Sequence, residues 1–169
     1  MSKQSFYIMC GLPYSGKSTL TKELVKRFGF SVGSMDAILD ERNFEVEKMT
    51  QDDWNYVYSE GYERMKQLLK EGKTVILDSG ALKLSERNTA RAIAADFGVP
   101  VKLIYINTPR QETQRRWLEN QTTKERGHLE EVSLNRAIDM FNEPTADENP
   151  IIYNHNMDLD QWIKDNIEI

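Results

Sequence analysis

The pattern Gly-x-x-x-x-Gly-Lys-Ser at residues 11–18 constrains the fold of this chain more than any other feature of the sequence. An apolar run at residues 6–10 ends directly before it, as a buried strand of a parallel sheet does. After it, Leu20, Leu24 and Phe28 recur at helical spacing. The pattern therefore lies on a turn that joins a buried strand to an amphipathic helix.

A turn of this kind can fold its backbone N–H groups around phosphate oxygens, and the positive end of the following helix strengthens the attraction. Lys17 is expected to reach the β- and γ-phosphates, Ser18 to complete the oxygen shell of Mg²⁺, and Thr19 to contact the α-phosphate. A dinucleotide site is not indicated, because the glycines do not follow G-x-G-x-x-G. The predicted nucleotide-binding residues of the loop are Gly11, Tyr14, Ser15, Gly16, Lys17, Ser18 and Thr19.

Apolar runs alternate with amphipathic stretches along the rest of the chain. Because parallel strands need crossover connections, this alternation predicts an α/β fold in which helices cover both faces of a parallel sheet. Residues 1–169 are expected to form a single domain. Ligands bind beyond the carboxyl ends of such strands. Further strands are expected at residues 30–32, 74–78, 101–106 and 151–153.

Two polar segments interrupt the alternation. Residues 37–49 are charged and poorly periodic, which favours an exposed segment beside the substrate. Residues 120–131 also lose apolar periodicity, so we expect a mobile loop there, within a lid at about residues 115–131. The helix that leads into the lid should begin at Thr108, a predicted N-cap followed by proline.

Two aspartates follow strand ends at the predicted ligand edge. Asp36 could accept a hydrogen bond from an attacking hydroxyl and take its proton during phosphoryl transfer. It could equally be the N-cap of a helix, and the spacing favours neither role. Asp78 closes an apolar run, where a carboxylate can hold Mg²⁺ directly or through water; the alternative for Asp78 is a surface turn.

Arginines gather near the predicted lid. Arg115, Arg116 and Arg126 flank the polar loop, and lid arginines can neutralise charge in the transition state or stack on adenine. Arg126 is the residue expected to close onto the substrate. Any single arginine could instead be a solvated helix charge. Candidates for substrate contact outside the lid are Arg42, Arg87 and Arg91.

The composition narrows the classes of ligand and location. Lys and Arg total 22 against 27 Asp and Glu, and the net charge of -5 gives no overall attraction to a polyanion. No run approaches the roughly 20 apolar residues that span a bilayer, and no signal peptide is recognisable, so a cytoplasmic protein is expected. Cys10 is the single cysteine, which excludes an internal disulfide and a thiolate-rich metal site. His128 and His155 lie outside metal-type spacing and are interpreted as ordinary polar residues.

The whole pattern resembles the P-loop kinases related to the kinase domain of phage polynucleotide kinase and, more distantly, the zeta-toxin and chloramphenicol phosphotransferase enzymes. The resemblance implies a P-loop NTPase three-layer sandwich with a five-stranded parallel sheet of order 2-3-1-4-5 and a helical lid. The residues that carry it are 11–18, Ser34-Met35-Asp36, 75–78 with Arg87, Arg116, Arg126, and Phe141-Asn142-Glu143-Pro144 with Glu148.

The resemblance also implies roles for single residues. Asp36 would be the general base, and Arg116 and Arg126 would be lid arginines that contact the phosphates or the base. Polynucleotide kinase carries an arginine three residues after its catalytic aspartate, where this chain has Leu39. Arg42 could replace that arginine, but its loss weakens the case for a nucleic-acid end as acceptor.

Three functional classes follow from these features. The favoured one is a kinase that uses ATP and Mg²⁺ to move the γ-phosphate to a hydroxyl of a small molecule or nucleoside, as Asp36 and the acidic surface suggest. The alternatives are a 5′-hydroxyl polynucleotide kinase, which the resemblance suggests, and a nucleotide-driven switch without an acceptor. The acceptor itself, the choice between ATP and GTP, and the oligomeric state are left open by the sequence.

Overall fold

The predicted apolar runs form one parallel sheet at the centre of the molecule. In the computed structural model, which describes residues 3–167, the strand order is β2-β3-β1-β4-β5 and every pairing is parallel. This confirms the predicted order 2-3-1-4-5. The strands are β1 (Phe6–Cys10), β2 (Ser31–Ser34), β3 (Val75–Asp78), β4 (Val101–Ile106) and β5 (Ile151–Tyr153).

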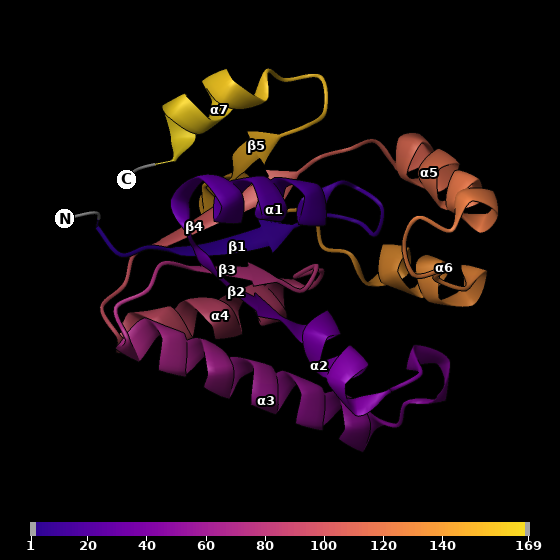
Figure 1. The fold of residues 1–169 in the computed structure, drawn as a ribbon, viewed down its shortest axis with the longest axis horizontal. Helices are drawn as coiled ribbons and strands as arrows, with labels where there is room; N and C mark the ends of the chain where they lie inside the picture. Colours follow the sequence, from indigo (N-terminus) through magenta and orange to yellow (C-terminus); the bar gives the residue numbers. More distant parts are fainter. Residues whose placement is uncertain (1–2, 168–169) are drawn as a thin grey trace.

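Helices cover both faces of the sheet, as Figure 1 shows. One face packs against α1 (Lys17–Phe28) and α7 (Leu159–Asn166), and the other against α3 (Gln51–Lys70) and α4 (Leu84–Asp96). A capping box formed by Thr50 and Asp53 begins α3. The fold is therefore the predicted three-layer α/β sandwich. No helix of the described residues is both long enough and apolar enough to cross a bilayer.

Strand β1 connects the two cores because its side chains alternate between the faces. Phe6, Ile8 and Cys10 pack with α3 and α4, whereas Tyr7 and Met9 pack with α1 and α7. All of them are fully buried. A strand that is apolar on both faces is typical of the middle of a covered parallel sheet. This central position places residues 11–18, the predicted phosphate-binding loop, in the middle of the edge where ligands are expected.

The segment between β2 and α3 differs from the expectation of an exposed stretch. Helix α2 (Met35–Arg42) forms there, followed by the short 3-10 helix η1 (Val46–Lys48). Ile38 and Leu39 of α2 are buried against the α3 face of the core. The prediction of exposure is confirmed for Ala37 and for residues 40–42 of α2 but is wrong for Ile38 and Leu39. An eight-residue helix with only one apolar stripe has too few positions to show a period.

The lid, residues 110–140, consists of α5 (Arg110–Thr123), a connection and α6 (Glu131–Met140). Helix α5 continues to Thr123, so the connection at 124–130 is shorter than the predicted loop. The side chains of Trp117 and Leu134 pack with Tyr14 of the phosphate-binding loop in a small cluster of their own. After α6, the 3-10 helix η2 (Ala146–Glu148) leads back to β5 at the sheet edge.

Candidate active site

The phosphate-binding loop, residues 11–18, runs from the end of β1 into the first turn of α1. A Cβ at Gly11 would stand 2.8 Å from both the Ile106 carbonyl oxygen and the Ser15 Oγ, so the packing there requires glycine. Gly16 has a φ of 106° and is the N-cap of α1. The first turn of α1 contains no acidic residue. Its backbone N–H groups are therefore left to attract an anion.

Two polar groups of the loop fit a nucleotide. The Lys17 Nζ donates to the carbonyl oxygens of Gly11, at 2.6 Å, and Leu12, at 2.8 Å. Burial lowers the pKa of Lys17 to about 8, although the Asp78 carboxylate acts in the opposite direction. The Ser15 Oγ is buried without a hydrogen-bond partner among the described residues. A bound triphosphate would supply acceptor oxygens to both groups.

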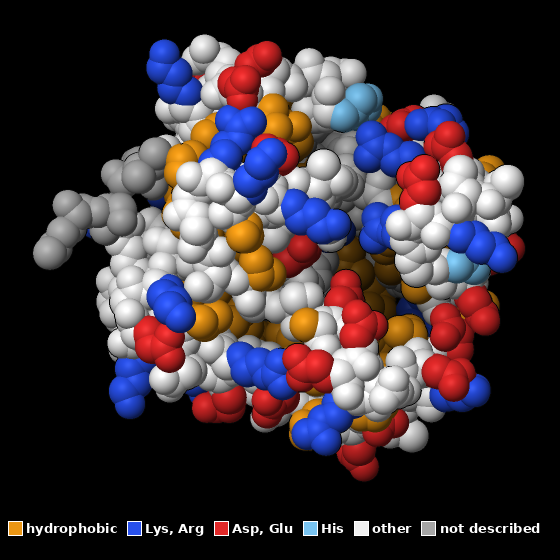
Figure 2. Space-filling view, viewed as in Figure 1, with side chains coloured by type: hydrophobic (Ala, Val, Ile, Leu, Met, Phe, Trp, Pro, Cys, Tyr) orange, Lys and Arg blue, Asp and Glu red, His pale blue; other side chains and the backbone are white. Residues whose placement is uncertain are grey.

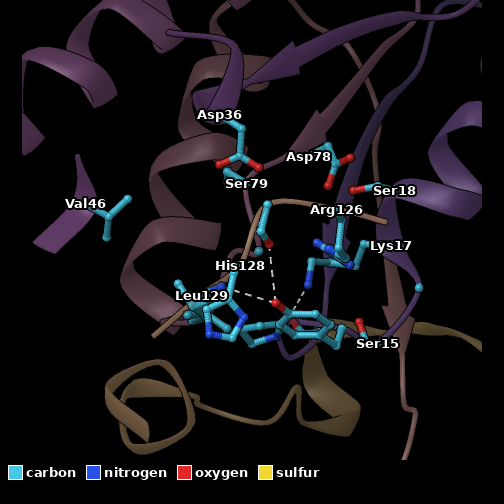
Figure 3. A pocket seen from close by; sticks show the side chains of 17 residues that line it. Ser15, Lys17, Ser18, Asp36, Val46, Asp78, Ser79, Arg126, His128 and Leu129 are labelled. Carbon is cyan, nitrogen blue, oxygen red and sulfur yellow. Dashed lines mark hydrogen bonds between the residues drawn. The ribbon is translucent and has the colours of Figure 1, made fainter. Parts of the chain in front are cut away.

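Asp78, at the end of β3, and Asp36, in helix α2 directly after β2, face the loop (Figure 3). Asp36 lies in the first turn of α2, whose N-cap is Ser34 with its Oγ accepting from the Ala37 N–H. The N-cap interpretation of Asp36 is therefore wrong. Burial raises the pKa of Asp36, and the Asp78 carboxylate raises it further. Such a carboxylate is suited to accept a proton from a hydroxyl.

Ser18 and Asp78 are placed to hold a metal ion. Figure 3 shows their side chains beside one another at the edge of the cavity. Within residues 3–167, no group of three or more His, Cys, Asp and Glu side chains could hold a metal by itself. Mg²⁺ usually keeps several waters and binds through one or two carboxylates together with substrate phosphates. A hydroxyl and a carboxylate beside a phosphate cradle fit that ion.

All of these groups line one cavity of about 350 Å³, within the range of small-molecule sites. Figure 2 shows this face hollowed beside the lid, with hydrophobic side chains at the bottom of the hollow. The loop forms one wall, Asp36 and Val46 another, and residues 126–129 of the lid close the third side. The remaining lining residues are Asp78, Ser79, Gly80 and Leu82. Phosphate-binding and proton-accepting groups therefore share one space.

Arg116 and Arg126 reach the loop from the lid. The Arg116 Nη1 donates to the carbonyl oxygens of Tyr14 and Ser15, both at 3.2 Å. Arg126 lines the cavity with its guanidinium 4.5 Å from the centroid of the Tyr14 ring. Arg115, by contrast, is exposed and pairs with glutamates of its own helix. The structure thus brings two of the three lid arginines to the predicted site.

Arg87 does not reach the cavity. Its side chain has 0% exposure, and its Nε and Nη2 donate to the two carboxylate oxygens of Glu148, each at 2.8 Å. Its Nη1 donates to the Ala81 carbonyl oxygen at 2.9 Å. A role in substrate contact is contradicted, because all three nitrogens bond within the core. The ion pair instead ties α4 and the segment after β3 to η2.

Two other arginines predicted to contact substrate also point elsewhere. The Arg42 guanidinium lies 5.1 Å from the centroid of the Tyr56 ring and donates to the Tyr56 hydroxyl. Arg91 donates to Glu148 at 2.7 Å. Neither lines the cavity around Asp36. The position where the resemblance expects an arginine is Leu39, which is buried. Arg42 does not replace that arginine in this structure, because it contacts Tyr56 outside the cavity.

The prediction of Thr108 as an N-cap is wrong, and no sequence feature indicated that Thr108 supports the loop or that the two histidines line cavities. The N-cap of α5 is Pro109, whereas the Thr108 hydroxyl donates to the Ser15 carbonyl oxygen at 2.7 Å. His128 lines the cavity next to Leu129. His155 lines a neighbouring space of about 290 Å³ beside the first turn of α1, together with Thr19, Arg116 and Tyr153. No local signal could have found them, because each acquires its place from strands and lid segments distant in the chain.

Comparison with known proteins assigns this chain to a family. Residues 6–144 match the model of the AAA_33 family, described as an AAA domain. The chain belongs to this family of P-loop kinases. The match begins at β1 and ends just after the lid. It therefore includes the phosphate-binding loop, both aspartates and both lid arginines of the site.

Individual relatives support the same assignment. A shikimate kinase of Clostridium botulinum strain Loch Maree is 31% identical over 76% of this chain and 78% of its own length. A probable gluconokinase of Schizosaccharomyces pombe is 27% identical over 86% of this chain and 77% of its own length. Among solved structures, a putative kinase from Chloroflexus aurantiacus aligns with a TM-score of 0.73 and 15% identity over 99% of this chain and 97% of that chain. The last likeness concerns the fold alone.

Proposed function

We propose that this protein is a kinase that uses ATP and Mg²⁺ to phosphorylate a hydroxyl of a small hydroxylated molecule. One observation carries the proposal: Asp36, with its raised pKa, lines the same cavity as the phosphate-binding loop. The names of the relatives, shikimate kinase and gluconokinase, support a small acceptor. The cavity volume of about 350 Å³ suits such a molecule.

The nucleotide would lie along the first turn of α1. The loop and Lys17 bind its β- and γ-phosphates, and Thr19 lies beside the α-phosphate. The base then extends into the neighbouring space between Arg116, Tyr153 and His155. Ser18 and Asp78 would hold Mg²⁺, which supplies charge neutralisation between the phosphate oxygens when it is bound.

Asp36 performs the proton transfer in this proposal. Its carboxylate accepts a hydrogen bond from the acceptor hydroxyl and takes its proton as the new O–P bond forms and the bond from the γ-phosphorus to the ADP oxygen breaks. Figure 3 shows Lys17 and Arg126 across the cavity from Asp36, where they would neutralise the charge that develops on the oxygens of the transferred group. The lid residues 126–129 line one side of the cavity and would limit the access of water to the bound substrates.

A nucleic-acid end is a less well supported acceptor. A polynucleotide would meet a protein of net charge -5, and the cavity contains no further arginine on the side of Asp36 among its described lining residues. Leu39 occupies the position where polynucleotide kinase has its substrate arginine. We therefore keep a 5′-hydroxyl kinase as a tested alternative rather than a second proposal.

The deciding experiment is a screen of label transfer from γ-labelled ATP with Mg²⁺. The acceptors are sugar acids and other small polyhydroxylated compounds, nucleosides, and oligonucleotides with free 5′-hydroxyls. We expect transfer to a small polyhydroxylated compound and none in the Lys17→Ala variant. Transfer to oligonucleotides alone would replace the proposal with the polynucleotide-kinase alternative, and ATP hydrolysis with no labelled acceptor would favour the nucleotide-driven switch.

A further inference from the structure

Tyr14 occupies an unusual backbone conformation at the centre of the phosphate-binding loop. The Ser15 N–H donates to the Leu12 carbonyl oxygen at 3.1 Å and closes a four-residue turn. Tyr14, the third residue of this turn, has a φ of 64°. Turns of this kind favour glycine at that position, and a bulky aromatic residue there is a conformational outlier. Such strain persists where the surroundings hold the residue in place, and it is concentrated at functional sites.

The surroundings that hold Tyr14 are those of the lid. The Tyr14 hydroxyl donates to the Gly127 carbonyl oxygen at 3.4 Å and accepts from the Leu129 N–H at 3.3 Å. Its ring supports the Arg126 guanidinium at 4.5 Å from the centroid. One side chain of the loop therefore contacts Arg126, Gly127 and Leu129 of the connection between the lid helices.

The lid is also built around the same ring. Tyr14 has 4% exposure and forms a buried cluster with Trp117 of α5 and Leu134 of α6. Leu129 packs against this cluster, and the Trp117 Nε1 donates to the Leu129 carbonyl oxygen at 2.6 Å. The ring is consequently the apolar contact by which both lid helices pack onto the phosphate-binding loop.

Arg126 depends on this arrangement for its position. Figure 3 shows its side chain beside Lys17, on the phosphate side of the cavity. Its backbone is anchored by Asn120, whose Oδ1 accepts from the Arg126 N–H at 3.2 Å. Its guanidinium faces the Tyr14 ring in a cation–π contact.

We propose that Tyr14 is a positioning residue: it fastens the lid to the phosphate-binding loop and thereby holds Arg126 over the site of the γ-phosphate. The role of Arg126 in transfer rests on the function proposed above, whereas the fastening of the lid does not. Tyr14 itself need not touch the substrate for this role. Its loss should therefore act on the rate of transfer rather than on the affinity for ATP.

The first test measures the lid directly and needs no acceptor. Limited digestion with trypsin cuts after Lys124 and Arg126 in the lid connection, and cleavage after Arg64 in α3 reports global unfolding in the same sample. Tyr14→Gly, which relieves the backbone strain, should speed lid cleavage about tenfold relative to cleavage after Arg64. Tyr14→Phe keeps the ring and loses the hydroxyl contacts, so it should give a smaller increase.

The matched control is Tyr56→Leu. Tyr56 carries Arg42 in the same kind of cation–π contact but lies outside the cavity. This variant should leave both lid cleavage and transfer at the wild-type level. Unchanged lid cleavage in Tyr14→Gly would overturn the proposal, and so would an equal increase in the Tyr56 control.

The second test uses the acceptor found in the screen. Tyr14→Gly should lower kcat by about 10- to 100-fold while the Kd for ATP stays within about threefold, because misplacing a catalytic group costs rate without removing the phosphate contacts. In an Arg126→Ala background, Tyr14→Gly should add little further loss. Additive losses of kcat in the double variant would refute the positioning role of Tyr14. A normal kcat in Tyr14→Gly together with faster lid cleavage would also refute it. If wild-type protein labels no acceptor, the proposed function fails, but trypsin cleavage still tests whether Tyr14 fastens the lid to the phosphate-binding loop.

Discussion

Thr108, which follows β4, supports the phosphate-binding loop, which follows β1: its buried hydroxyl donates to the Ser15 carbonyl oxygen at 2.7 Å. The same carbonyl accepts a longer bond, 3.2 Å, from the Arg116 Nη1. The loop that binds phosphate is therefore supported from the strand on one side and from the lid on the other. Its shape depends on residues about half a chain away.

Thr108→Val should loosen this support without creating a cavity, because the two side chains have similar shapes. Arg116 still satisfies the Ser15 carbonyl, so we expect a loss of about 1 kcal/mol in the free energy of unfolding and a weaker affinity for ATP. Thr89→Val, which removes an exposed hydroxyl bonded within α4, serves as the control. Urea unfolding and ATP titration of both variants test this, and equal ATP affinity in the two would argue against support of the loop by Thr108.

The pKa of Lys17 predicts how ATP affinity depends on pH. Bound phosphates favour the charged lysine, whereas the free protein loses the proton above about pH 8. Affinity should therefore be insensitive to this residue below about pH 8 and fall above it, by up to about tenfold per pH unit, because binding must take up a proton. Calorimetry near pH 9 in two buffers of different ionisation enthalpy measures that uptake.

Two variants define the controls for this measurement. Lys17→Ala should bind ATP more weakly at every pH and should not show the fall in affinity above pH 8. It should also give no detectable phosphate transfer. Lys26→Ala, which changes an exposed lysine of the same helix, should reproduce the wild-type curve. Near-normal turnover in a folded Lys17→Ala protein would contradict the proposed kinase.

Asp36→Asn separates a general base from a structural residue. Ser34 already caps α2, so the folded state should keep its melting temperature, and ATP affinity should stay within a few-fold of wild type. Transfer should fall by about 10²–10⁴-fold because the amide cannot take the proton. In the wild type, kcat/KM should rise with pH through a pKa above the ordinary aspartate value of 3.8, since only the ionised carboxylate acts as base.

Asp40→Asn is the control for that prediction. Asp40 lies one turn further along α2 and is one of the charges that raise the pKa of Asp36. Its replacement should keep transfer within a few-fold of wild type and move the acid limb of the pH profile to lower pH. Normal turnover in Asp36→Asn would remove Asp36 from the mechanism and favour the nucleotide-driven switch.

The buried Arg87–Glu148 pair predicts a loss of stability in acid. Hydrogen bonds from Arg87 lower the pKa of Glu148 to about 2, from an ordinary value of 4.5. A depressed carboxyl pKa stabilises the fold above about pH 4.5, and this contribution is lost as pH falls from there towards 2. Glu148→Gln should cost about 3–5 kcal/mol at neutral pH, because it leaves the Arg87 charge buried without its partner.

Denaturant unfolding at pH 7 and at pH 3 measures both effects. In Glu148→Gln the dependence of stability on pH below 4.5 should be shallower than in wild type, by up to about 1.4 kcal/mol per pH unit. Glu130→Gln, at an exposed position before α6, should leave the free energy of unfolding and its dependence on pH unchanged. A parallel pH dependence in Glu148→Gln and wild type would show that Arg87 does not hold the carboxylate in this way.

Much of the fold follows from local patterns. The apolar run at β1, the glycine-rich loop and the amphipathic α1 are adjacent in sequence, and short-range sterics and periodicity are sufficient to predict them. The sheet order entered through the resemblance to known kinases, and the structure confirms it. Helix α2 was missed because its eight residues bury only one short stripe. The predicted mobility of the lid remains a prediction.

The sequence by itself determined the strand–loop–helix unit that binds phosphate and the aspartates at the strand ends, because these depend on neighbours within a few residues. Only the tertiary structure decided which distant side chains complete the site. Arg87 was predicted to contact substrate, but Glu148, 61 residues further along the chain, holds it in the core. Tyr14 meets Gly127 across 113 residues and Thr108 meets Ser15 across 93. Such contacts depend on how strands and helices pack in three dimensions, and the spacing of residues along the sequence does not predict them.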